Sequence, residues 1–515
     1  MTNTTSGCSA LLTGATGFLG HHILAELLER RWRCTVLLRH PLEGSIARLN
    51  ALLAEVGIDF ARYVGDGLLR PVCAELPDTL PSLELDDSPT VLIHTAAATN
   101  FRRSATGEPE RTNVEGTRAV LAWATQLGLR RVHLVSSAYA CGRTSESVAE
   151  VFNPRPASFH NDYEKSKWEA ERLCTDWARR TGFEVTIHRP SIMVGAFQSG
   201  RATKFGGIYL SARAAELLGR MHQNGTRLHA LSIPLRIKGR PLDRQNIVPV
   251  DYVARMIVAA AATEDAGGRV YHLVHPNPPS NLQIKHAFER YFDIGGGRFV
   301  SPEEFSCADL NELERSFYDV VSPIEHYFVD APVFHREHAA ALERLAGITC
   351  PVYDVAAIHR FVRFAQSASW GRRRSGGTVS APGCAEYFES FLPVHIEKSK
   401  VARVTALSAA VGFVIDDEPD GHWVCTFDGG RLTRVDRGCY RQQEDFGYRT
   451  TRAVFWESVS GSPHPQELFL TGRAEMFGDI EQALKMSMIL HSFTREFPCD
   501  QKRLALFVQR SCRRK

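Results

Sequence analysis

The chain has 515 residues, of which 44% are hydrophobic and 23% are charged. This length exceeds what one hydrophobic core usually fills, so we expect two or three domains. The 61 basic and 58 acidic side chains leave a net charge of +3, which is too small to favour nucleic acid or an anionic membrane as a partner. The basic runs at residues 372–374 and 513–515 are expected to be solvated charge in a linker and a tail.

The twelve cysteines include no Cys-x-x-Cys pair, so the sequence predicts neither a zinc ribbon nor a dithiol redox motif, and no metal site. Reduced thiols and a cytoplasmic location fit this pattern best. The first residues lack a basic region and their apolar stretch is broken by glycines, so we expect no signal peptide. Since no run of eighteen apolar residues occurs, we expect no transmembrane segment.

Short apolar runs alternate with helical stretches over the first 192 residues, at 10–12, 35–38, 91–94, 131–136 and 184–188. Continuous apolar strands separated by helices are typical of a parallel sheet buried on both faces. The pattern predicts an α/β fold of the Rossmann type, with a doubly wound parallel sheet.

A glycine-rich turn follows the first predicted strand. Its three glycines stand three residues apart, which gives a tight turn, room for backbone amides to approach a pyrophosphate, and close packing of the next helix on the sheet. That helix is expected to begin near Phe18 and to point its positive end at the phosphates. The predicted dinucleotide contacts in this turn are Gly14, Thr16, Gly17, Phe18, Leu19 and Gly20.

Arg39 stands at the end of the second predicted strand, where folds that prefer NAD place an acidic residue for the ribose hydroxyls. A guanidinium at this point favours the 2′-phosphate of NADPH, and Arg48 on the next helix offers a second charge-assisted contact. The sequence therefore predicts NADPH as cofactor and reduction as the direction of the reaction.

Tyr163 and Lys167 are four residues apart, which places them on one face of a helix. A phenol with a pKa of about 10 needs a nearby positive charge to act near neutral pH, and the lysine supplies one. Ser137 lies at the carboxyl end of the fourth of these strands, the edge at which doubly wound sheets bind ligands. Asn113 opens the helix that precedes this strand.

Beyond the sheet, the alternation decays, and residues 197–366 are interpreted as a substrate lobe attached to the cofactor-binding region, the whole domain covering 1–366. Helices are predicted over 305–317 and 335–345. The Ser-, Gly- and Arg-rich stretch 367–383 is typical of a linker. Residues 384–515 then form a smaller α+β domain, with a hairpin about residues 428–430 and a helix that begins after the N-cap Asp479.

The first 192 residues resemble the extended short-chain dehydrogenase/reductases. The resemblance rests on motifs in family order: the glycine turn, Asp66 after the third strand, His94-Thr95-Ala96-Ala97, Asn113 with Gly116-Thr117, Ser137, Tyr163 with Lys167, and Arg189-Pro190-Ser191. It implies that Tyr163 donates the proton, Ser137 orients the substrate oxygen, and Lys167 binds the ribose and tunes the phenol. It further implies that Asn113 holds a relay water.

For the cofactor, the same resemblance implies that Asp66 lies near the adenine, while Ala96 and Pro190 line the cleft. Within the superfamily, the segments 99–101, 189–195 and 246–253 resemble the thioester reductase and fatty acyl-CoA reductase branch. That branch reduces acyl groups carried by coenzyme A or by a carrier protein. No adenylation or carrier domain accompanies the reductase in this sequence, so the acyl donor is expected to arrive separately.

The last 130 residues resemble the sterol carrier protein type two family, on the hairpin at 422–435, the segment 469–473 leading to Gly478-Asp479, and the apolar helix that follows. The resemblance implies a lipid ligand in an apolar tunnel. Met486, Met488 and Phe493 are, taken singly, expected to be ordinary core residues.

Together these features predict an NADPH-dependent reductase that converts a lipid-like acyl thioester to an aldehyde or an alcohol. Two alternatives stay open: a dehydrogenase acting on a ketone or alcohol of a steroid, polyketide or other lipid, and a binding protein for cofactor and lipid that has no catalytic activity.

Overall fold

The computed structural model describes residues 7–85, 90–104, 106–152, 155–222, 231–307, 309–322, 324–329, 332–371, 384–399, 408–418, 421–437, 444–461, 464–500 and 503–504. Both basic runs singled out in the sequence, at 372–374 and 513–515, lie outside these residues.

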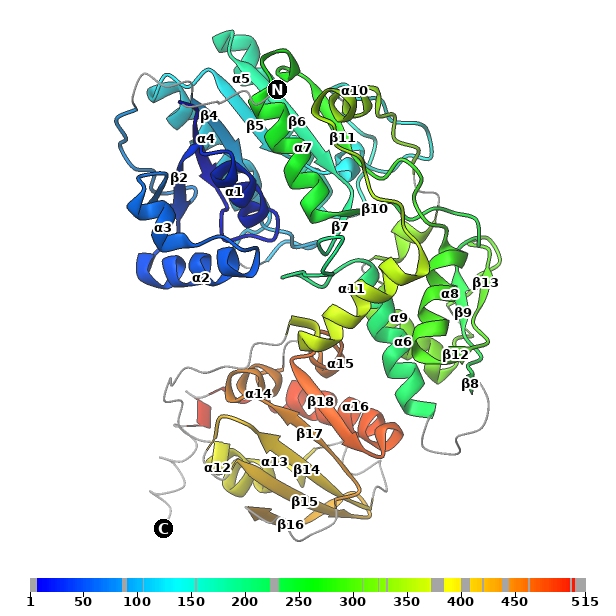
Figure 1. Cartoon of the computed structure of the whole chain (residues 1–515). Helices are drawn as coiled ribbons and strands as arrows, with labels where there is room; N and C mark the ends of the chain where they lie inside the picture. Colours follow the sequence, from blue (N-terminus) through cyan, green and yellow to red (C-terminus); the bar gives the residue numbers. More distant parts are fainter. Residues whose placement is uncertain are drawn as a thin grey trace.

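A seven-stranded parallel sheet forms the first part of the chain, in the order β11-β6-β5-β4-β1-β2-β3 (Figure 1). The strands are β1 (Ser9–Thr13), β2 (Arg33–Leu38), β3 (Leu69–Cys73), β4 (Thr90–His94), β5 (Arg131–Val135), β6 (Glu184–Pro190) and β11 (Val270–Leu273). The strand order reverses at β1, as in doubly wound nucleotide-binding sheets. The predicted fold class is confirmed.

Helices cover both faces of this sheet, because neighbouring residues of each strand point to opposite faces. Leu12 of β1 belongs to the core shared with α1 (Gly20–Glu29), α2 (Leu42–Glu55) and α7 (Val250–Ala262). Leu11 belongs to the core shared with α4 (Gly116–Gln126) and α5 (Asp162–Thr181). Burial on both sides explains why the strands read as continuous apolar runs.

A second lobe stands beside the carboxyl edge of the sheet. It contains α6 (Ile208–His222), α8 (Asn281–Phe292), α9 (Glu312–Val321), a 3-10 turn at Glu325–Phe328 and α11 (Val355–Ser367). Three short parallel strand pairs join these helices: β10 (Ile247–Pro249) with β7 (Ile192–Val194), β12 (Ile294–Gly295) with β8 (Leu231–Ser232), and β13 (Arg298–Val300) with β9 (Arg236–Lys238).

Two features of this region differ from the sequence expectation. Within 197–366 the chain returns to the sheet, since α7 packs on α1, β11 is the seventh strand, and α10 (Glu337–Ala346) packs on both α7 and β11. The helix predicted over 305–317 begins only at Glu312 and continues to Val321. Asn311 sets this start, because its side chain accepts from the Glu314 amide while Glu314 accepts from the Asn311 amide, a capping box.

The beginning of the predicted linker is structured. Helix α11 continues to Ser367, and a 3-10 turn follows at Ser369–Gly371. This turn buries Trp370, whose indole nitrogen donates to Glu216 Oε2 at 2.8 Å. Residues 372–383 of the predicted linker lie outside the described residues.

The C-terminal domain is a five-stranded mixed sheet in the order β16-β15-β14-β17-β18, covered by helices. Its strands are β14 (Ala409–Ile415), β15 (His422–Asp428), β16 (Arg431–Arg437), β17 (Phe446–Thr450) and β18 (Ala474–Gly478). Its helices are α12 (Cys384–Glu386), α13 (Leu392–Ile396), α14 (Arg452–Val459), α15 (Pro465–Leu470) and α16 (Ile480–Glu496). The predicted α+β class is confirmed.

Local sequence signals in this domain predicted most of the features checked, namely the hairpin, the helix cap and two of three core residues. Asp428 pairs with Arg431 across a two-residue turn of glycines with φ of 53° and 80°, the turn that suits a β-hairpin. Asp479 caps α16 by accepting from the Gln482 amide. Phe493 and Met486 are buried as expected, but Met488 is 47% exposed, so the prediction that it is a core residue is wrong.

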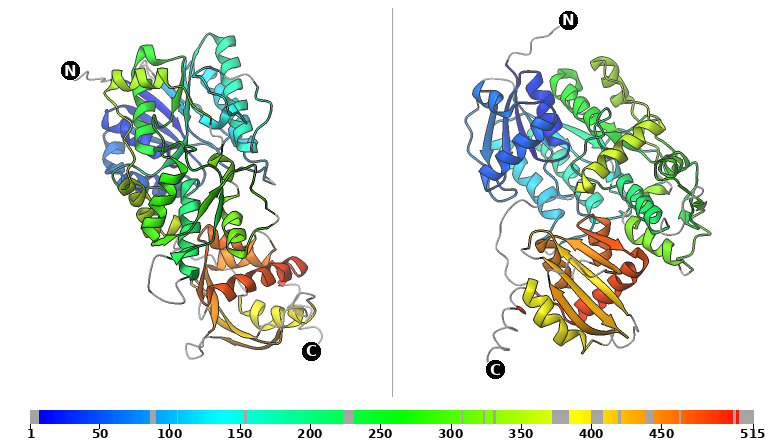
Figure 2. Two further views of the ribbon diagram at one scale, coloured as in Figure 1. Left: turned by 90° about the vertical axis from the view of Figure 1, so that its right-hand side faces the viewer. Right: turned by 60° about the horizontal axis from the view of Figure 1, so that its bottom comes forward.

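The C-terminal domain packs against the second lobe through α15, which contacts α6 and α9. Figure 2 shows this contact from two further sides. Leu470 at the end of α15 is buried in the core of the second lobe together with Leu218 and Phe317. The two parts therefore share apolar packing.

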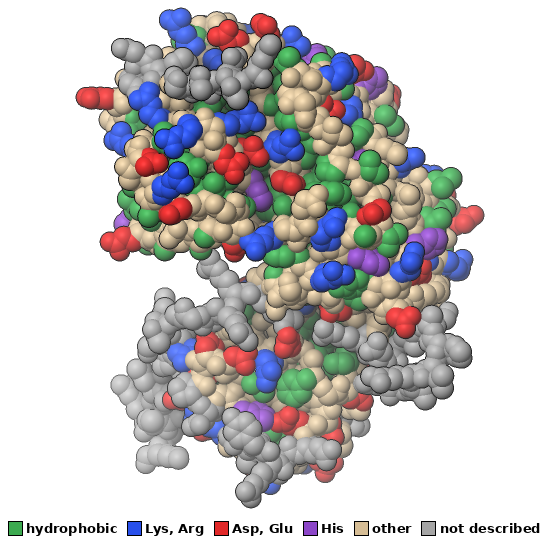
Figure 3. All heavy atoms as spheres, in the orientation of Figure 1, with side chains coloured by type: hydrophobic (Ala, Val, Ile, Leu, Met, Phe, Trp, Pro, Cys, Tyr) green, Lys and Arg blue, Asp and Glu red, His purple; other side chains and the backbone are tan. Residues whose placement is uncertain are grey.

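Among the described residues, no helix combines the length and the apolar character that a bilayer crossing requires. On the face drawn in Figure 3, basic and acidic side chains are interspersed, in keeping with the small net charge.

Candidate functional site

The glycine turn connects β1 to α1. Gly14 has a φ of +74°, and the Gly17 amide donates to the Gly14 carbonyl at 2.8 Å. A Cβ atom on Gly20 would stand 2.0 Å from the Gly14 carbonyl oxygen, and one on Gly14 would stand 2.6 Å from the Ala96 nitrogen. Side chains at these positions would therefore break the turn.

Helix α1 begins at Gly20 and not near Phe18, because the tight turn extends through Leu19. The side chains of Phe18 and Leu19 are buried in the core. Their predicted contacts with a dinucleotide would thus come from the backbone, as at other helix starts that bind phosphate.

A buried hydrogen-bond chain ties this turn to the end of β4. The two nitrogens of His94 contact Thr13 Oγ1 at 2.7 Å and Thr117 Oγ1 at 3.1 Å. Burial lowers the pKa of His94 to about 3, so the ring is neutral and its nitrogens divide into one donor and one acceptor. Thr13 Oγ1 also accepts from the Ala96 amide at 3.1 Å. This network holds Ala96 against the glycine turn.

Arg39 and Arg48 are both exposed near this turn. Arg39 directly follows β2, and Arg48 lies on α2. The Arg48 charge lowers the pKa of His21, in the first turn of α1, and the pKa of Lys204. For both groups burial is the larger cause of the lowered pKa. Lys204 also donates to Thr99 Oγ1 at 3.3 Å. Lys204 could not be predicted from the sequence, because no local motif marks it and it lies far along the chain from Arg48.

Asp66 is not where the resemblance placed it. It caps the C-terminal end of α3 (Phe60–Gly65) and precedes β3, with its carboxylate 3.6 Å from Arg31 and 3.9 Å from Arg62. Residues before a parallel strand lie at the amino edge of the sheet, opposite the glycine turn. The expectation that Asp66 lies near the adenine is therefore wrong. The acidic residue that follows β3 at the carboxyl edge is Glu75.

Ser137 and Tyr163 meet at the carboxyl end of β5. Ser137 caps the short 3-10 turn Ala138–Cys141, and its hydroxyl accepts from the Tyr139 amide at 3.2 Å. The Ser137 side chain is close enough to the Tyr163 phenol to affect its pKa. Burial raises the pKa of Tyr163 to about 12, against the lowering effect of Ser137. The expected lowering of this pKa by the lysine is not found in the protein alone.

Lys167 lies one turn further along α5 and is 3% exposed. Its ammonium donates to the Val135 carbonyl of β5 at 2.7 Å. Burial lowers the pKa of Lys167 to about 8, while Glu171 opposes the shift. The lysine thus ties α5 to the strand that carries the site.

The buried pair Arg189–Glu171 makes a second tie between α5 and the sheet. Arg189 on β6 donates from Nε and Nη2 to the two carboxylate oxygens of Glu171, at 2.9 and 2.6 Å. The two side chains are 0% and 4% exposed. The next residue, Pro190, ends β6 at the carboxyl edge.

Asn113 lies in a single π-helical turn, Arg111–Glu115, that opens α4. Its amide nitrogen donates to the Ala98 carbonyl at 2.9 Å and to Ser166 Oγ at 2.8 Å, and its oxygen accepts from the Ala98 amide at 2.8 Å. Asn113 therefore joins the loop after β4 to α5. Its relay-water role stays a prediction.

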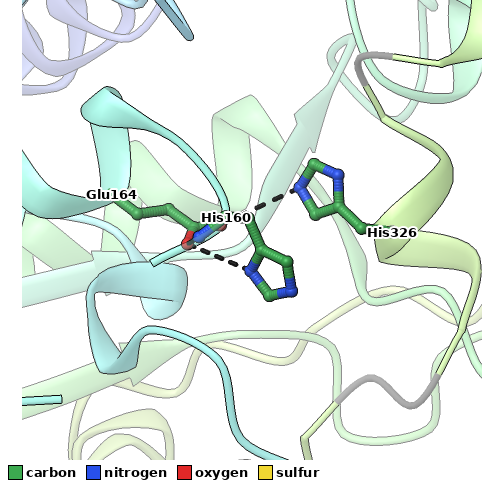
Figure 4. Close-up of side chains that lie close together, drawn as sticks. All are labelled: His160, Glu164 and His326. Carbon is green, nitrogen blue, oxygen red and sulfur yellow. Dashed lines mark hydrogen bonds and ion pairs between the residues drawn. The ribbon is translucent and has the colours of Figure 1, made fainter. Parts of the chain in front are cut away.

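A further polar cluster contains Glu164, the residue after Tyr163, together with His160 and His326 (Figure 4). Glu164 is fully buried, and its Oε2 lies 3.1 Å from His160 Nδ1 while its Oε1 lies 4.0 Å from His326 Nε2. Tyr327 donates to Glu164 Oε1 at 2.8 Å. His326 and Tyr327 come from the second lobe, so no sequence spacing indicated this cluster.

Comparisons with known proteins agree with the geometry. Residues 12–257 match the NAD-binding family model described as male sterility protein, and residues 388–491 match the SCP-2 sterol transfer family. The aldehyde reductase lnaA of Aspergillus flavus is 28% identical over 398 residues, which cover 70% of this chain and 36% of that protein. The glycine betaine reductase ATRR of Emericella nidulans is 27% identical over 450 residues, which cover 80% of this chain and 32% of that reductase.

Two solved structures share the fold. The terminal R domain of the myxalamid PKS-NRPS pathway has a TM-score of 0.56 at 23% identity, covering 71% of this chain and 92% of that one. A thiolation-reductase di-domain from an archaeal non-ribosomal peptide synthetase has a TM-score of 0.53 at 20% identity, covering 72% and 94%. The chain spans about a third of the length of the curated relatives that it matches.

The first part of the chain is thus a reductase-type oxidoreductase domain of the short-chain dehydrogenase/reductase class, with an NAD(P)-binding sheet. More specifically, the chain joins an NAD-binding domain of the male sterility protein family to a C-terminal domain of the SCP-2 sterol transfer family.

The glycine turn gives a direct test of dinucleotide binding. We expect Gly20→Ala to weaken NADPH binding at least tenfold, measured by isothermal titration calorimetry, because its Cβ collides with the Gly14 carbonyl. Gly65→Ala is the control, since no atom lies within 4 Å of a Cβ there. Unchanged affinity in Gly20→Ala would contradict the assigned role of the turn.

Proposed function

We propose that the protein is an NADPH-dependent reductase that converts an apolar acyl thioester to an aldehyde, or onward to an alcohol. One observation carries the proposal: Ser137, Tyr163, Lys167 and Asn113 gather at the carboxyl edge of the sheet, beside the glycine turn. The predicted roles of these residues enter here as parts of the proposal.

NADPH, when bound, supplies the hydride that adds to the thioester carbonyl carbon. The Ser137 and Tyr163 hydroxyls hydrogen-bond the carbonyl oxygen as it gains negative charge. The Tyr163 hydroxyl then gives its proton to this oxygen, which yields a hemithioacetal. Collapse of the hemithioacetal breaks the carbon–sulfur bond and releases an aldehyde and a thiol. Lys167, held by the Val135 carbonyl, keeps a positive charge beside the phenol.

Removal of the phenol hydroxyl tests this mechanism. We expect Tyr163→Phe to lower kcat at least a hundredfold, because a positioned general acid contributes that much. Affinity for NADPH should stay within about twofold, since the ring remains. Thiol release from a long-chain acyl-CoA, followed together with loss of NADPH absorbance, is the measurement.

The same assay separates the alternatives. Turnover of a ketone with no thiol release would instead support a ketone reductase, and no turnover of either substrate would support a binding protein. Wild-type turnover in Tyr163→Phe would contradict the assignment of the proton donor.

The preference for NADPH rests on the basic side chains around the glycine turn. Arg39 stands where an acidic residue would bind the ribose hydroxyls. Arg48 and Lys204 are close enough that the Arg48 charge lowers the pKa of Lys204. Several cations in one place suit the 2′-phosphate of NADPH.

We expect Arg39→Asp to weaken NADPH binding at least tenfold more than NADH binding, because the carboxylate repels the phosphate and accepts from ribose hydroxyls. Binding of both cofactors by calorimetry gives the ratio. Arg30→Asp, at the far end of α1, is the control. Equal losses for the two cofactors would contradict the role of Arg39.

An apolar pocket in the second lobe supports an acyl substrate. It has a volume of about 90 Å³, and its lining includes Ala215, Leu218, Ile284, Phe317 and Phe328. This volume is below the ~150 Å³ of a cavity that accepts benzene, so it suits a short chain or the end of a longer one.

A row of aromatic side chains leads from Tyr163 to Tyr327, the sequence neighbour of the pocket residue Phe328. Tyr327 adjoins Phe328, and its ring stands 4.5 Å from Tyr139 and 6.4 Å from Phe101, whose ring is 6.4 Å from Tyr163. We propose that an acyl chain bound in this pocket extends along these rings toward Tyr163.

We expect Ala215→Phe to shift the preferred acyl-CoA to a shorter chain, because the added ring fills the pocket. The ratio of kcat/KM values over a series of chain lengths is the measurement. Ala346→Phe, at the exposed end of α10, is the control. An unchanged chain-length profile in Ala215→Phe would argue against this pocket as the acyl site.

The acyl donor is either coenzyme A or a carrier protein. The solved thiolation-reductase di-domain favours a carrier-bound thioester, and the SCP-2 family of the C-terminal domain favours a lipid ligand there.

The ten cysteines that the structure describes are all free thiols, which supports a reducing, cytoplasmic location.

A further inference from the structure

His160, Glu164 and His326 offer three metal-ligating atoms that all lie within 4.8 Å of one another (Figure 4). We propose that these side chains bind a divalent transition metal, with Zn²⁺ as the best-suited ion. The proposal is independent of the reductase activity, since it depends on the ligand atoms alone.

The three ligand atoms are close enough for one zinc ion once the two imidazole rings turn toward it. Zn²⁺ is bound at about 2.0–2.2 Å by imidazole and carboxylate groups in tetrahedral geometry, which puts neighbouring ligand atoms roughly 3.3 Å apart. The observed distances are 3.1 Å from His160 Nδ1 to Glu164 Oε2 and 4.0 Å from His326 Nε2 to Glu164 Oε1. The His160 and His326 rings stack with centroids 4.4 Å apart and planes 16° from parallel, so both rings must turn before their nitrogens point at one ion.

The chemistry of the donor set selects the metal. Two imidazoles with one carboxylate suit zinc, while magnesium and calcium prefer all-oxygen sites. The three protein ligands would leave a fourth position for water. The His326 and His160 side chains are 22% and 25% exposed, while the Glu164 side chain is fully buried.

His326 provides a second, separate observation. Its Nε2 is buried and makes no hydrogen bond in the part of the chain that the structure describes. A buried ring nitrogen without a partner carries an energetic penalty, which a metal ion would remove. In Figure 4 this nitrogen faces the Glu164 carboxylate.

Hydrogen bonds already hold the central carboxylate. Tyr327 donates to Oε1 at 2.8 Å, and the His160 amide donates to Oε2 at 2.9 Å. Such contacts orient a ligating carboxylate. Oε2 also has a hydrogen-bond contact with His160 Nδ1 at 3.1 Å, which a bound ion would replace. The Arg143 charge also acts on His326, which limits the affinity for a cation.

The location gives the site a structural consequence. Glu164 is in the first turn of α5, next to Tyr163, and His160 precedes the N-cap Asn161, whereas His326 belongs to the second lobe. A bound ion would therefore fasten the lobe to the helix that carries the tyrosine.

The test uses the full chain, stripped of metal and dialysed against Zn²⁺, with bound metal measured by mass spectrometry. We expect one tightly bound ion per chain, and at least tenfold weaker binding in His326→Gln. His338→Gln is the matched control, because His338 also faces a buried carboxylate, Glu150 at 3.9 Å, but belongs to no three-ligand group among the described residues. Equal affinity in wild type and His326→Gln, or no bound zinc in wild type, would overturn the proposal.

Cobalt(II) loading of the wild-type chain keeps the test independent of how the variants fold. A tetrahedral site of nitrogen and oxygen gives visible ligand-field bands without a sulfur charge-transfer band. X-ray absorption should show imidazole scattering from the bound ion. A sulfur-ligated spectrum would place the metal on the cysteines and overturn the proposal.

Discussion

The buried pair of Arg189 and Glu171 fixes helix α5 against strand β6, and Lys167 fixes the same helix against β5. Loss of one partner of such a pair leaves an uncompensated charge in the core and costs about 3–5 kcal/mol. Because α5 also carries Tyr163, the position of the phenol relative to Ser137 depends on these two ties. The geometry of the candidate site is therefore set by interactions about one and two helical turns away from the tyrosine.

A second layer of constraint runs along the carboxyl edge of the sheet. The neutral ring of His94 joins Thr13, at the end of β1, to Thr117 on α4. Asn113, in the π-helical turn before α4, joins the loop after β4 to α5. The glycine turn and the tyrosine helix are thus connected through fully buried polar groups, each of which has a partner. Buried networks of this kind hold their members in one arrangement, because an unsatisfied member is costly.

Sequence reasoning succeeded where the determinant was local. The strands, the glycine turn, the hairpin after Asp428 and the cap at Asp479 each depend on a few consecutive residues. It failed where the determinant was a distant partner or a precise boundary. Asp66 was assigned to the wrong edge because the start of β3 was not located, and Lys204 and His326 reach the site only through the fold of the second lobe. The helix predicted over 305–317 was misplaced because its cap, Asn311, was not recognised.

Leu470 makes the C-terminal domain and the second lobe depend on each other for the burial of apolar surface. It belongs to the C-terminal domain in sequence but to the hydrophobic core of the second lobe in space. Cutting the chain between the two domains would uncover apolar surface on both α15 and the helices beneath it. The two domains should accordingly be prone to aggregate when they are produced separately. In the full chain, thermal unfolding of one domain should destabilise the other, so that the two unfold together.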